Sequence, residues 1–245
     1  MKRWKRMLAV FAATLLFLCA QGAHAEFGPA ALPTQPGIDV SQWQGEIDFA
    51  RVKEAGVWGV YIRSSLGESY RDPYFERNAE GARGAGLKYG FYHFLTATTV
   101  EEADVQAAFF AREISRYRYT LRPAMDFGVS DRVLNDDEFN RVAAAFLSRV
   151  EQLTGVKPVI YSDAYGARAR YFRNLAQYPL WVADYAESVE PNGKWTAWAG
   201  WQYADDGRVC GVEGNVDLDW FTDALRVGGA VPEPSPSPAP CVGEE

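Results

Sequence analysis

The sequence predicts an α/β fold, an irregular TIM-like barrel in which five βα units are followed by three strands with few helices between them. Short apolar runs rich in Val, Ile, Tyr and Trp alternate along the chain with segments of helical period. This is the pattern of repeated βα units around a mostly parallel sheet. The runs number eight, and eight strands in this order favour closure into a barrel.

Each strand is expected where a short apolar run is bounded by turn residues. In chain order, the expected strands are residues 37–40, 57–63, 88–94, 122–127, 158–161, 180–183, 199–203 and a short last strand near Val216.

The expected helices are residues 48–55, 73–85, 100–116, 136–154, 163–171 and 220–227. An Asp opens the first of them and a Pro stands in the first turn of the second, both of which are common helix starts. Three helices are expected to end at a glycine, namely Gly56, Gly86 and Gly155.

The chain begins with a predicted secretory signal. Residues 1–6 are strongly basic, residues 7–20 are apolar, and Ala23-His-Ala25 gives the small-x-small pattern that precedes signal-peptidase cleavage. The mature chain is therefore expected to begin near Glu26. The apolar run is shorter than the ~20 residues of a spanning helix, so no membrane insertion is expected after cleavage. The expected location is secreted, extracellular or associated with the cell wall.

Three segments are expected after the signal: a short N-terminal arm (26–35), one barrel domain (36–227) and a Pro-rich tail (228–245). The domain is long enough for one sizeable core. From Val231 the tail reads Val-Pro-Glu-Pro-Ser-Pro-Ser-Pro-Ala-Pro, an extended composition that cannot build a core. We expect the tail to have no fixed fold.

The cysteines leave two questions open. A lipid-modified Cys19 is the alternative to a simple secretory signal, but bulky Leu18 stands where a lipoprotein signal usually has a small residue. After cleavage only Cys210 and Cys241 remain. In an oxidising exterior they either pair, which would tie the tail to the domain, or stay unpaired.

Composition argues against several classes of protein. The formal net charge is −7, and removal of the basic signal leaves the chain more acidic still, so nucleic acid is not an expected partner. His93 is the only histidine of the mature chain, and no Cys/His cluster has metal-ligand spacing. We expect no metal and no cofactor, and we interpret His93 as a core residue because no nucleophile elbow accompanies it.

Acidic residues stand at the carboxyl ends of five expected strands, where barrels of this kind place their chemistry. They are Asp39, Asp126, Asp163, Asp184 and Asp217. Aromatic residues on or next to the expected strands accompany them, namely Tyr61, Tyr92, Tyr161, Trp181, Tyr185, Trp201 and Tyr203. Rings that stack on pyranose faces beside carboxylates that accept from hydroxyls are typical of a sugar site.

Strand alternation limits this interpretation, because about half of such rings are expected to point into packing. The groups expected to bind a sugar are Tyr92, Tyr161, Trp181, Asp184 and Trp201.

Eight short motifs follow one another in the chain. They are Gly37-Ile-Asp-Val-Ser-Gln-Trp-Gln-Gly45, Tyr61-Ile-Arg63, Asp72-Pro-Tyr-Phe75, Gly90-Phe-Tyr-His-Phe94, Pro158-Val-Ile-Tyr-Ser162, Pro179-Leu-Trp-Val-Ala183, Gly200-Trp-Gln-Tyr203 and Asn215-Val-Asp-Leu-Asp219. Together they resemble glycoside hydrolase family 25, the Chalaropsis-type lysozymes, from about Pro36 to Leu225.

The resemblance implies a flattened barrel and cleavage of the β-1,4 bond after N-acetylmuramic acid in bacterial peptidoglycan. It also implies catalytic positions. Asp39 and Asp217 match acidic residues that line the family's groove. Asp126 matches the aspartate of the family's Asp-x-Glu signature. In the family this aspartate steadies the substrate's acetamido group, which acts as the nucleophile.

The third position of that signature departs from the family. The family has a glutamate there as general acid, whereas this chain reads Asp126-Phe-Gly128. General-acid catalysis contributes typically ~10²–10⁴-fold, so hydrolysis by the family's usual route is expected to be impaired. Gly128→Glu is expected to restore the donor.

Three functions remain open from the sequence. The first is an exported muramidase with a substitute acid, for which Asp131, Asp163 and Asp184 are the candidates. The second is a pseudoenzyme that binds peptidoglycan glycan through the retained groove. The third, a barrel with another ligand, is disfavoured by the ordered matches at separate strand ends.

Overall fold

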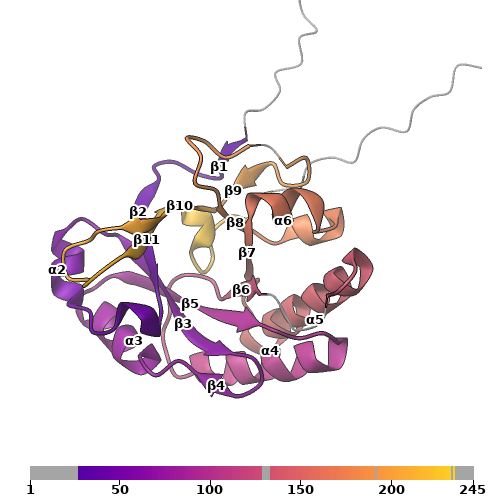
Figure 1. Cartoon of the computed structure of the whole chain (residues 1–245), viewed down its shortest axis with the longest axis horizontal. Coiled ribbons are helices and arrows are strands. Elements are labelled where there is room, and N and C mark those ends of the chain that lie inside the picture. The colour runs from indigo at the N-terminus through magenta and orange to yellow at the C-terminus, as the bar shows by residue number, and fades with distance from the viewer. Residues whose placement is uncertain (1–26, 129–132, 191, 233, 235–245) are drawn as a thin grey trace, which may run out of the picture.

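The computed structural model describes residues 27–128, 133–190, 192–232 and 234 (Figure 1). The predicted signal segment, Asp131, Cys241 and most of the Pro-rich tail lie outside these residues. Cys210 is exposed, and its expected alternative partner is not among the described residues.

Eight strands close into a barrel, as the sequence predicts. They are β2 (Gln35–Val40), β3 (Gly59–Leu66), β5 (Lys88–Leu95), β6 (Ala124–Phe127), β7 (Val159–Asp163), β8 (Leu180–Ala183), β10 (Gly200–Gly207) and β11 (Val216–Phe221). Their order is β2-β11-β10-β8-β7-β6-β5-β3, and parallel pairing of β3 with β2 completes the ring. Only β11 runs antiparallel to its two neighbours in this ring.

Five helices of the described part of the chain connect or cover the strands. They are α2 (Phe49–Glu54), α3 (Phe75–Gly84), α4 (Val100–Ile114), α5 (Asp136–Thr154) and α6 (Ala164–Ala169). Figure 1 shows α3, α4 and α5 outside the strands of the first half of the barrel, whereas the second half has the short helix α6 beside β7 and β8. The expected irregularity of the second half is confirmed.

The remaining elements are short. They are β1 (Gly28–Pro29), which pairs with β9 (Ala197–Trp198), β4 (Tyr70–Arg71) beside β3, and the 3-10 turns η1 (Gln42–Gln44), η2 (Arg173–Gln177) and η3 (Asp223–Leu225).

The helix expected over residues 220–227 is wrong. Trp220 and Phe221 continue β11, and Thr222 then caps the single turn η3 through its side chain. Phe221 pairs with both β2 and β10 and is fully buried inside the barrel. Ladder bonds and burial in the barrel therefore override the helical spacing of the apolar residues.

A second, smaller core fills the lower half of the barrel. Tyr61 stacks on Trp181 with ring centroids 4.5 Å apart, and Phe221 packs edge-on against both. Glycines make room for these rings, because a Cβ on Gly37 would lie 2.1 Å from Phe221 and one on Gly90 would lie 2.9 Å from Tyr61. The rings form a closed floor, so any ligand must enter from the opposite end.

His93 is a core residue, as expected. It is fully buried, with Nδ1 2.8 Å from Ser65 Oγ and Nε2 3.2 Å from Gln106 Oε1. Burial lowers the pKa of His93 to about 4, so the ring is neutral at physiological pH.

Elsewhere in the fold, none of the described helices has the length and apolar character needed to cross a bilayer.

Candidate active site

The inward-facing residues directly above the aromatic floor are acidic. Strand residues two apart face the same side, so Asp39 lies one step above Gly37, and Asp126 one step above Ala124. Because β11 is antiparallel, its first residues reach this same end, and Asp217 pairs with Asp39 in the sheet register. The structure thus brings together the three carboxylates that the sequence analysis assigned to catalysis.

These carboxylates share one small cavity of about 110 Å³. Its lining residues are Asp39, Tyr92, Asp126, Tyr161, Trp181, Gln202 and Asp217. Three of the five groups expected to bind a sugar are among them. Trp181 is only 1% exposed and contributes the floor.

Gln202 organises the cavity, although sequence reasoning did not assign it a role. Its Nε2 donates to Asp39 Oδ2 at 2.7 Å, and its Oε1 accepts from the hydroxyls of Tyr161 (2.9 Å) and Tyr185 (3.0 Å). An amide bonded in this way is fixed in one orientation, so Asp39 keeps its place without a ligand. The signal was available in the Gly200-Trp-Gln-Tyr203 motif, where alternation places Gln202 inward.

Asp219 is the second residue that the sequence analysis left out. It lies two residues after Asp217 and therefore faces the same way, and its Oδ1 accepts from Trp181 Nε1 at 2.7 Å. It is 1% exposed and lies below the cavity. Asp219 thus adds a further carboxyl beneath Asp39, with a pKa that burial raises well above its ordinary value, and it binds the floor tryptophan.

Burial raises the pKa of all three cavity carboxyls, and neighbouring carboxylates add to the effect at Asp39 and Asp217. Burial raises the pKa of Asp126 to about 7, against a smaller lowering by Arg63. Burial, reinforced by Asp205, raises the pKa of Asp217 to about 6, against a lowering by its hydrogen bond with Asp39. The pKa of Asp39 lies well above its ordinary value because of burial first and the charges of Asp219 and Asp217 next. The cavity therefore holds protons at neutral pH that exposed aspartates would release.

Two predicted sugar-binding residues lie off this cavity. Trp201 faces the side opposite to Gln202, and its Nε1 donates to the carbonyl oxygen of Asp184 at 2.6 Å. The Asp184 carboxylate accepts from the main-chain nitrogen of Ala186 at 3.2 Å. Both residues shape the loop after β8, beside the mouth of the barrel.

The space at Gly128 is occupied by a neighbouring ring. A Cβ built on Gly128 would lie 2.0 Å from Phe94 Cζ and 2.2 Å from Phe94 Cε1. No heavy atom can approach so closely, so any side chain at this position requires Phe94 to move. The ring of Phe94, which pairs with Asp126 in the sheet register, therefore fills the space beside Gly128.

A second cavity of about 460 Å³ adjoins the first and shares Asp126 and Tyr161 with it. Asp163, the acid at the end of β7, lies here, and its side chain accepts from the main-chain nitrogen of Gly166 as the cap of α6. Arg170 stands on the opposite wall with its Cζ 4.0 Å from the Phe139 ring centroid.

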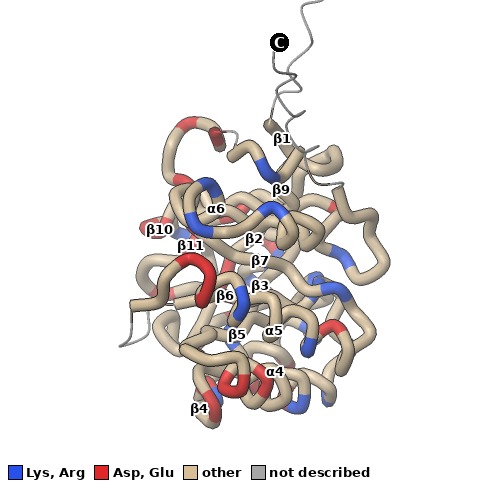
Figure 2. The backbone as a smooth tube through the Cα atoms, turned by 90° about the vertical axis from the view of Figure 1, so that its right-hand side faces the viewer, with Lys and Arg blue, Asp and Glu red and all other residues tan. Residues whose placement is uncertain are grey.

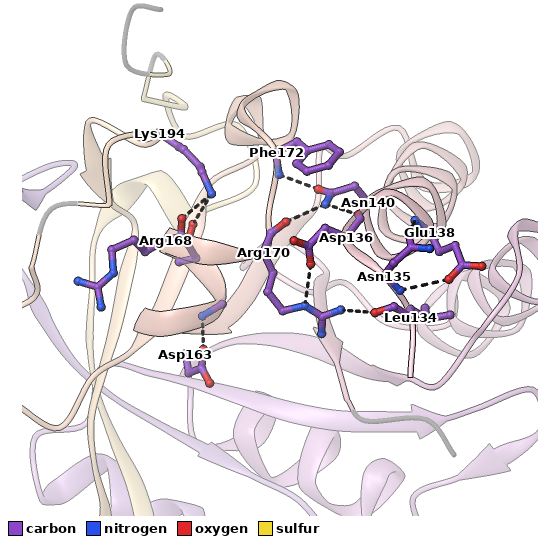
Figure 3. A network of polar contacts seen from close by, with 12 residues as sticks. Leu134, Asn135, Asp136, Glu138, Asn140, Asp163, Arg168, Arg170, Phe172 and Lys194 are labelled. Carbon is purple, nitrogen blue, oxygen red and sulfur yellow. Dashed lines mark hydrogen bonds and ion pairs between the residues drawn. The ribbon is translucent and has the colours of Figure 1, made fainter. Parts of the chain in front are cut away.

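Polar contacts hold that wall in place, as Figure 3 shows. Arg170 Nη2 donates to the Leu134 carbonyl at 3.1 Å, and Arg170 Nε lies 3.5 Å from Asp136 Oδ1. Lys194 Nζ donates to the Arg168 carbonyl at 2.7 Å. Basic residues gather on and after α6, the segment marked blue in Figure 2. The central cavity is thus acidic, whereas the adjoining cavity has a basic residue, Arg170, in its wall.

The chain is similar to known lysozymes in sequence. The model of Glycosyl hydrolases family 25 matches residues 38–212. The chain is 34% identical over 195 residues to the autolytic lysozyme of Clostridium acetobutylicum, covering 80% of this chain and 58% of that protein. It is 33% identical over 207 residues to lysozyme M1 of Streptomyces globisporus, covering 79% and 70%.

The fold is also similar to solved structures. The bacterial lysozyme from Streptomyces coelicolor superposes with a TM-score of 0.72 at 30% identity, covering 82% of this chain and all of that one. The muramidase from Trichobolus zukalii gives a TM-score of 0.66 at 29% identity, covering 78% and 95%. The family match, these relatives and the shared barrel lead to one conclusion: the chain belongs to glycosyl hydrolase family 25, the family of the lysozyme-type peptidoglycan hydrolases.

Proposed function

We propose that this protein is an exported muramidase that hydrolyses the β-1,4 bond after N-acetylmuramic acid in bacterial peptidoglycan. The observation that supports it most is the convergence of Asp39, Asp126 and Asp217 on one cavity at the mouth of a family 25 barrel. Tyr92 and Tyr161 line the same cavity, so carboxylates and rings adjoin as sugar binding requires.

Asp126 takes the role of steadying the acetamido group of the muramic acid residue, which attacks the neighbouring sugar carbon. This role needs a carboxyl that accepts a hydrogen bond inside a dry site and can carry a charge there. Burial of Asp126 supplies the dry site, and the positive charge of Arg63 favours the ionised form. Asp39 and Asp217 hold the glycan in register, and Asp39, whose pKa burial raises well above its ordinary value, retains a proton near neutral pH. Such a proton can reach the leaving oxygen.

Turnover is expected to be slow, because Gly128 supplies no general acid. A carboxyl elsewhere in the cavity approaches the leaving oxygen less well than a dedicated donor, and misplacement by about 1 Å can cost ~10²-fold. Of the candidate donors taken from the sequence, Asp163 caps α6 and the Asp184 carboxylate binds its own loop. Neither lines the central cavity.

Release of new reducing ends from purified peptidoglycan tests the proposal. Residues 26–245 should release them, and the Asp126→Asn variant should release at least ~10²-fold fewer. The exposed Asp206→Asn variant is the matched control and should behave as the parent. Absence of reducing ends at high protein concentration over long incubation would exclude hydrolysis.

A second function, glycan binding without turnover, is favoured by one observation: Phe94 occupies the space beside Gly128. In that case the protein should sediment with insoluble cell wall and release no reducing ends. Asp39→Ala and Asp126→Ala should both weaken sedimentation, since both side chains line the cavity. Unchanged sedimentation of both variants would place binding outside the groove.

A further inference from the structure

The turn η1, directly after Asp39, presents a large ring to solvent. Trp43 is 78% exposed, the most of any aromatic side chain among the described residues. Full burial of a side chain of this size is worth about 1.5–3 kcal/mol or more, so its exposure forgoes that stabilisation. Single exposed hydrophobic residues are common on protein surfaces, and exposure alone decides nothing.

What distinguishes Trp43 is that its turn is held rigid. Ser41 and Gln44 form a capping box, with Trp43 N donating to Ser41 Oγ at 3.3 Å and Ser41 N donating to Gln44 Oε1 at 2.9 Å. Gln42 N donates to Asp72 Oδ2 at 3.0 Å, and Asp72 is itself buried against Arg63 at 2.8 Å. A ring on such a turn loses little conformational freedom when it binds a partner.

The turn is also tied to both sides of the catalytic cavity. Gln44 Nε2 donates to the Asn215 carbonyl at 3.4 Å, two residues before Asp217. Asp39, on the other side, lies two residues before Ser41. The turn is therefore connected to both of the strands that carry Asp39 and Asp217.

Neutral polar side chains meet at this turn, because Tyr70 is hydrogen-bonded to Gln42, the residue directly before Trp43. The Tyr70 hydroxyl donates to Gln42 Oε1 at 2.5 Å, and the Tyr70 ring is 43% exposed. An apolar face edged by amides and a phenol matches a pyranose, which offers C–H groups on one face and hydroxyls at its edge. Charged ligands find no partner in this set, because Asp72 is already neutralised by Arg63.

We propose that Trp43, together with Tyr70 and Gln42, is a sugar subsite at the rim, separate from the central cavity, that stacks on a pyranose further along the glycan strand. The subsite rests on the proposed function, since a long glycan must first lie across the mouth. If the subsite exists, the binding affinity depends on the length of the glycan. Short fragments fill the central cavity, and longer ones also reach Trp43.

Calorimetric titration with peptidoglycan oligosaccharides of two, four, six and eight sugars tests this subsite. The titration is run at 4 °C to slow hydrolysis. The oligosaccharides are recovered afterwards to verify that they have not been cleaved. The parent chain, Trp43→Ala and Trp43→Phe are compared. Phe172→Ala is the control, because Phe172 is an exposed aromatic that lines neither the central nor the adjoining cavity.

The subsite predicts that parent affinity rises with chain length and that Trp43→Ala removes about tenfold of the affinity for the longest sugar. Disaccharide affinity should be unchanged, Trp43→Phe should keep part of the gain, and Phe172→Ala should match the parent. Equal binding of all lengths by parent and Trp43→Ala overturns the subsite. Equal loss for short and long sugars places Trp43 in the central cavity and also overturns it. If the parent binds no sugar of any length, the proposed function fails and this subsite fails with it.

Discussion

At the scale of single residues, one cation stands among the crowded carboxyls. Arg63 is 8% exposed on β3, and its positive charge lowers the pKa of Asp126 against the effect of burial. Asp72 holds the guanidinium through a 2.8 Å contact with Nε while accepting from the main-chain nitrogens of Gln42 and Tyr74. Arg63 is thus a positioning residue that keeps part of Asp126 ionised near neutral pH.

Arg63→Met is expected to raise the pKa of Asp126 above its value of about 7, because the only lowering contribution to that pKa is removed. Arg63→Lys keeps the charge and should leave the pKa close to that of the parent. Carbon NMR titration of the Asp126 carboxyl measures this directly, with thermal unfolding run first to confirm that each variant is folded. The same pKa in the parent and the Met variant would show that Arg63 does not act on Asp126.

Gly128→Glu alone is expected to give little gain in turnover, which modifies the expectation from sequence. The new Cβ would meet the Phe94 ring at 2.0 Å, so the side chain is displaced or the wall is strained. Combined with Phe94→Ala, the same change should raise reducing-end release by ~10²-fold or more, because the donor then has room. Phe94→Ala is the control and should show no gain. A full gain from Gly128→Glu alone would mean that Phe94 yields freely.

At the scale of elements, α5 and α6 act as one wall of the groove because a buried amide joins them (Figure 3). Asn140 Nδ2 donates to the carbonyls of Asp136 (2.7 Å) and Arg170 (2.8 Å), and its Oδ1 accepts from Phe172 N at 2.7 Å. The residue is 5% exposed. The segment after α6 therefore takes its position from α5.

Asn140→Ala is expected to lower the free energy of unfolding by about 1–3 kcal/mol, because it leaves the partly buried Arg170 carbonyl and Phe172 N–H without their side-chain partner. Urea unfolding measures the loss. The exposed Asn174→Ala is the matched control and should change stability by less than about 0.5 kcal/mol. A loss no larger than that of the control would show that the wall holds without this amide.

The positions of the eight barrel strands could be predicted from the sequence, whereas the helix expected over residues 220–227 could not be told from a strand. Apolar alternation reports which residues face the barrel, so eight strands and the carboxylates at their ends could be placed without a structure. Residues 220–225 have apolar spacing that suits a helix equally well, and only pairing with β2 and β10 decides between the two. The roles of Gln202 and Phe94 depend on contacts across the barrel, which no local pattern reports.

At the scale of the whole molecule, closure of the barrel forces the acids together. Because β11 is antiparallel between β10 and β2, it delivers Asp217 and Asp219 to the end where the parallel strands deliver Asp39 and Asp126. Folding thus buries carboxyls that repel one another when ionised. The site is held at a cost in stability that grows as the carboxyls ionise.

That cost predicts a pH dependence of stability. Asp126 has a pKa of about 7 when folded and about 3.9 when unfolded. Between these values the folded chain holds a proton that the unfolded chain releases, so the contribution of Asp126 to the free energy of unfolding falls as pH rises. Asp126→Asn removes this effect, and its stability relative to the parent should rise between pH 4 and pH 8 by up to about 4 kcal/mol.

Urea unfolding at several pH values measures the difference between parent and Asp126→Asn. His93 titrates in both proteins, so its effect cancels. The exposed Asp206→Asn should show a constant difference from the parent. A constant difference for Asp126→Asn as well would mean that Asp126 ionises as easily in the folded chain as in the unfolded one.

The most direct test of the proposed function is the identity of the sugar at each newly exposed reducing end. Peptidoglycan digested with residues 26–245 is reduced with borohydride, and the reduced ends are identified by mass spectrometry. The proposed muramidase predicts reduced N-acetylmuramic acid, formed slowly by the parent and absent with Asp126→Asn. Reduced N-acetylglucosamine, or no reduced sugar from a preparation that sediments with the cell wall, would contradict it.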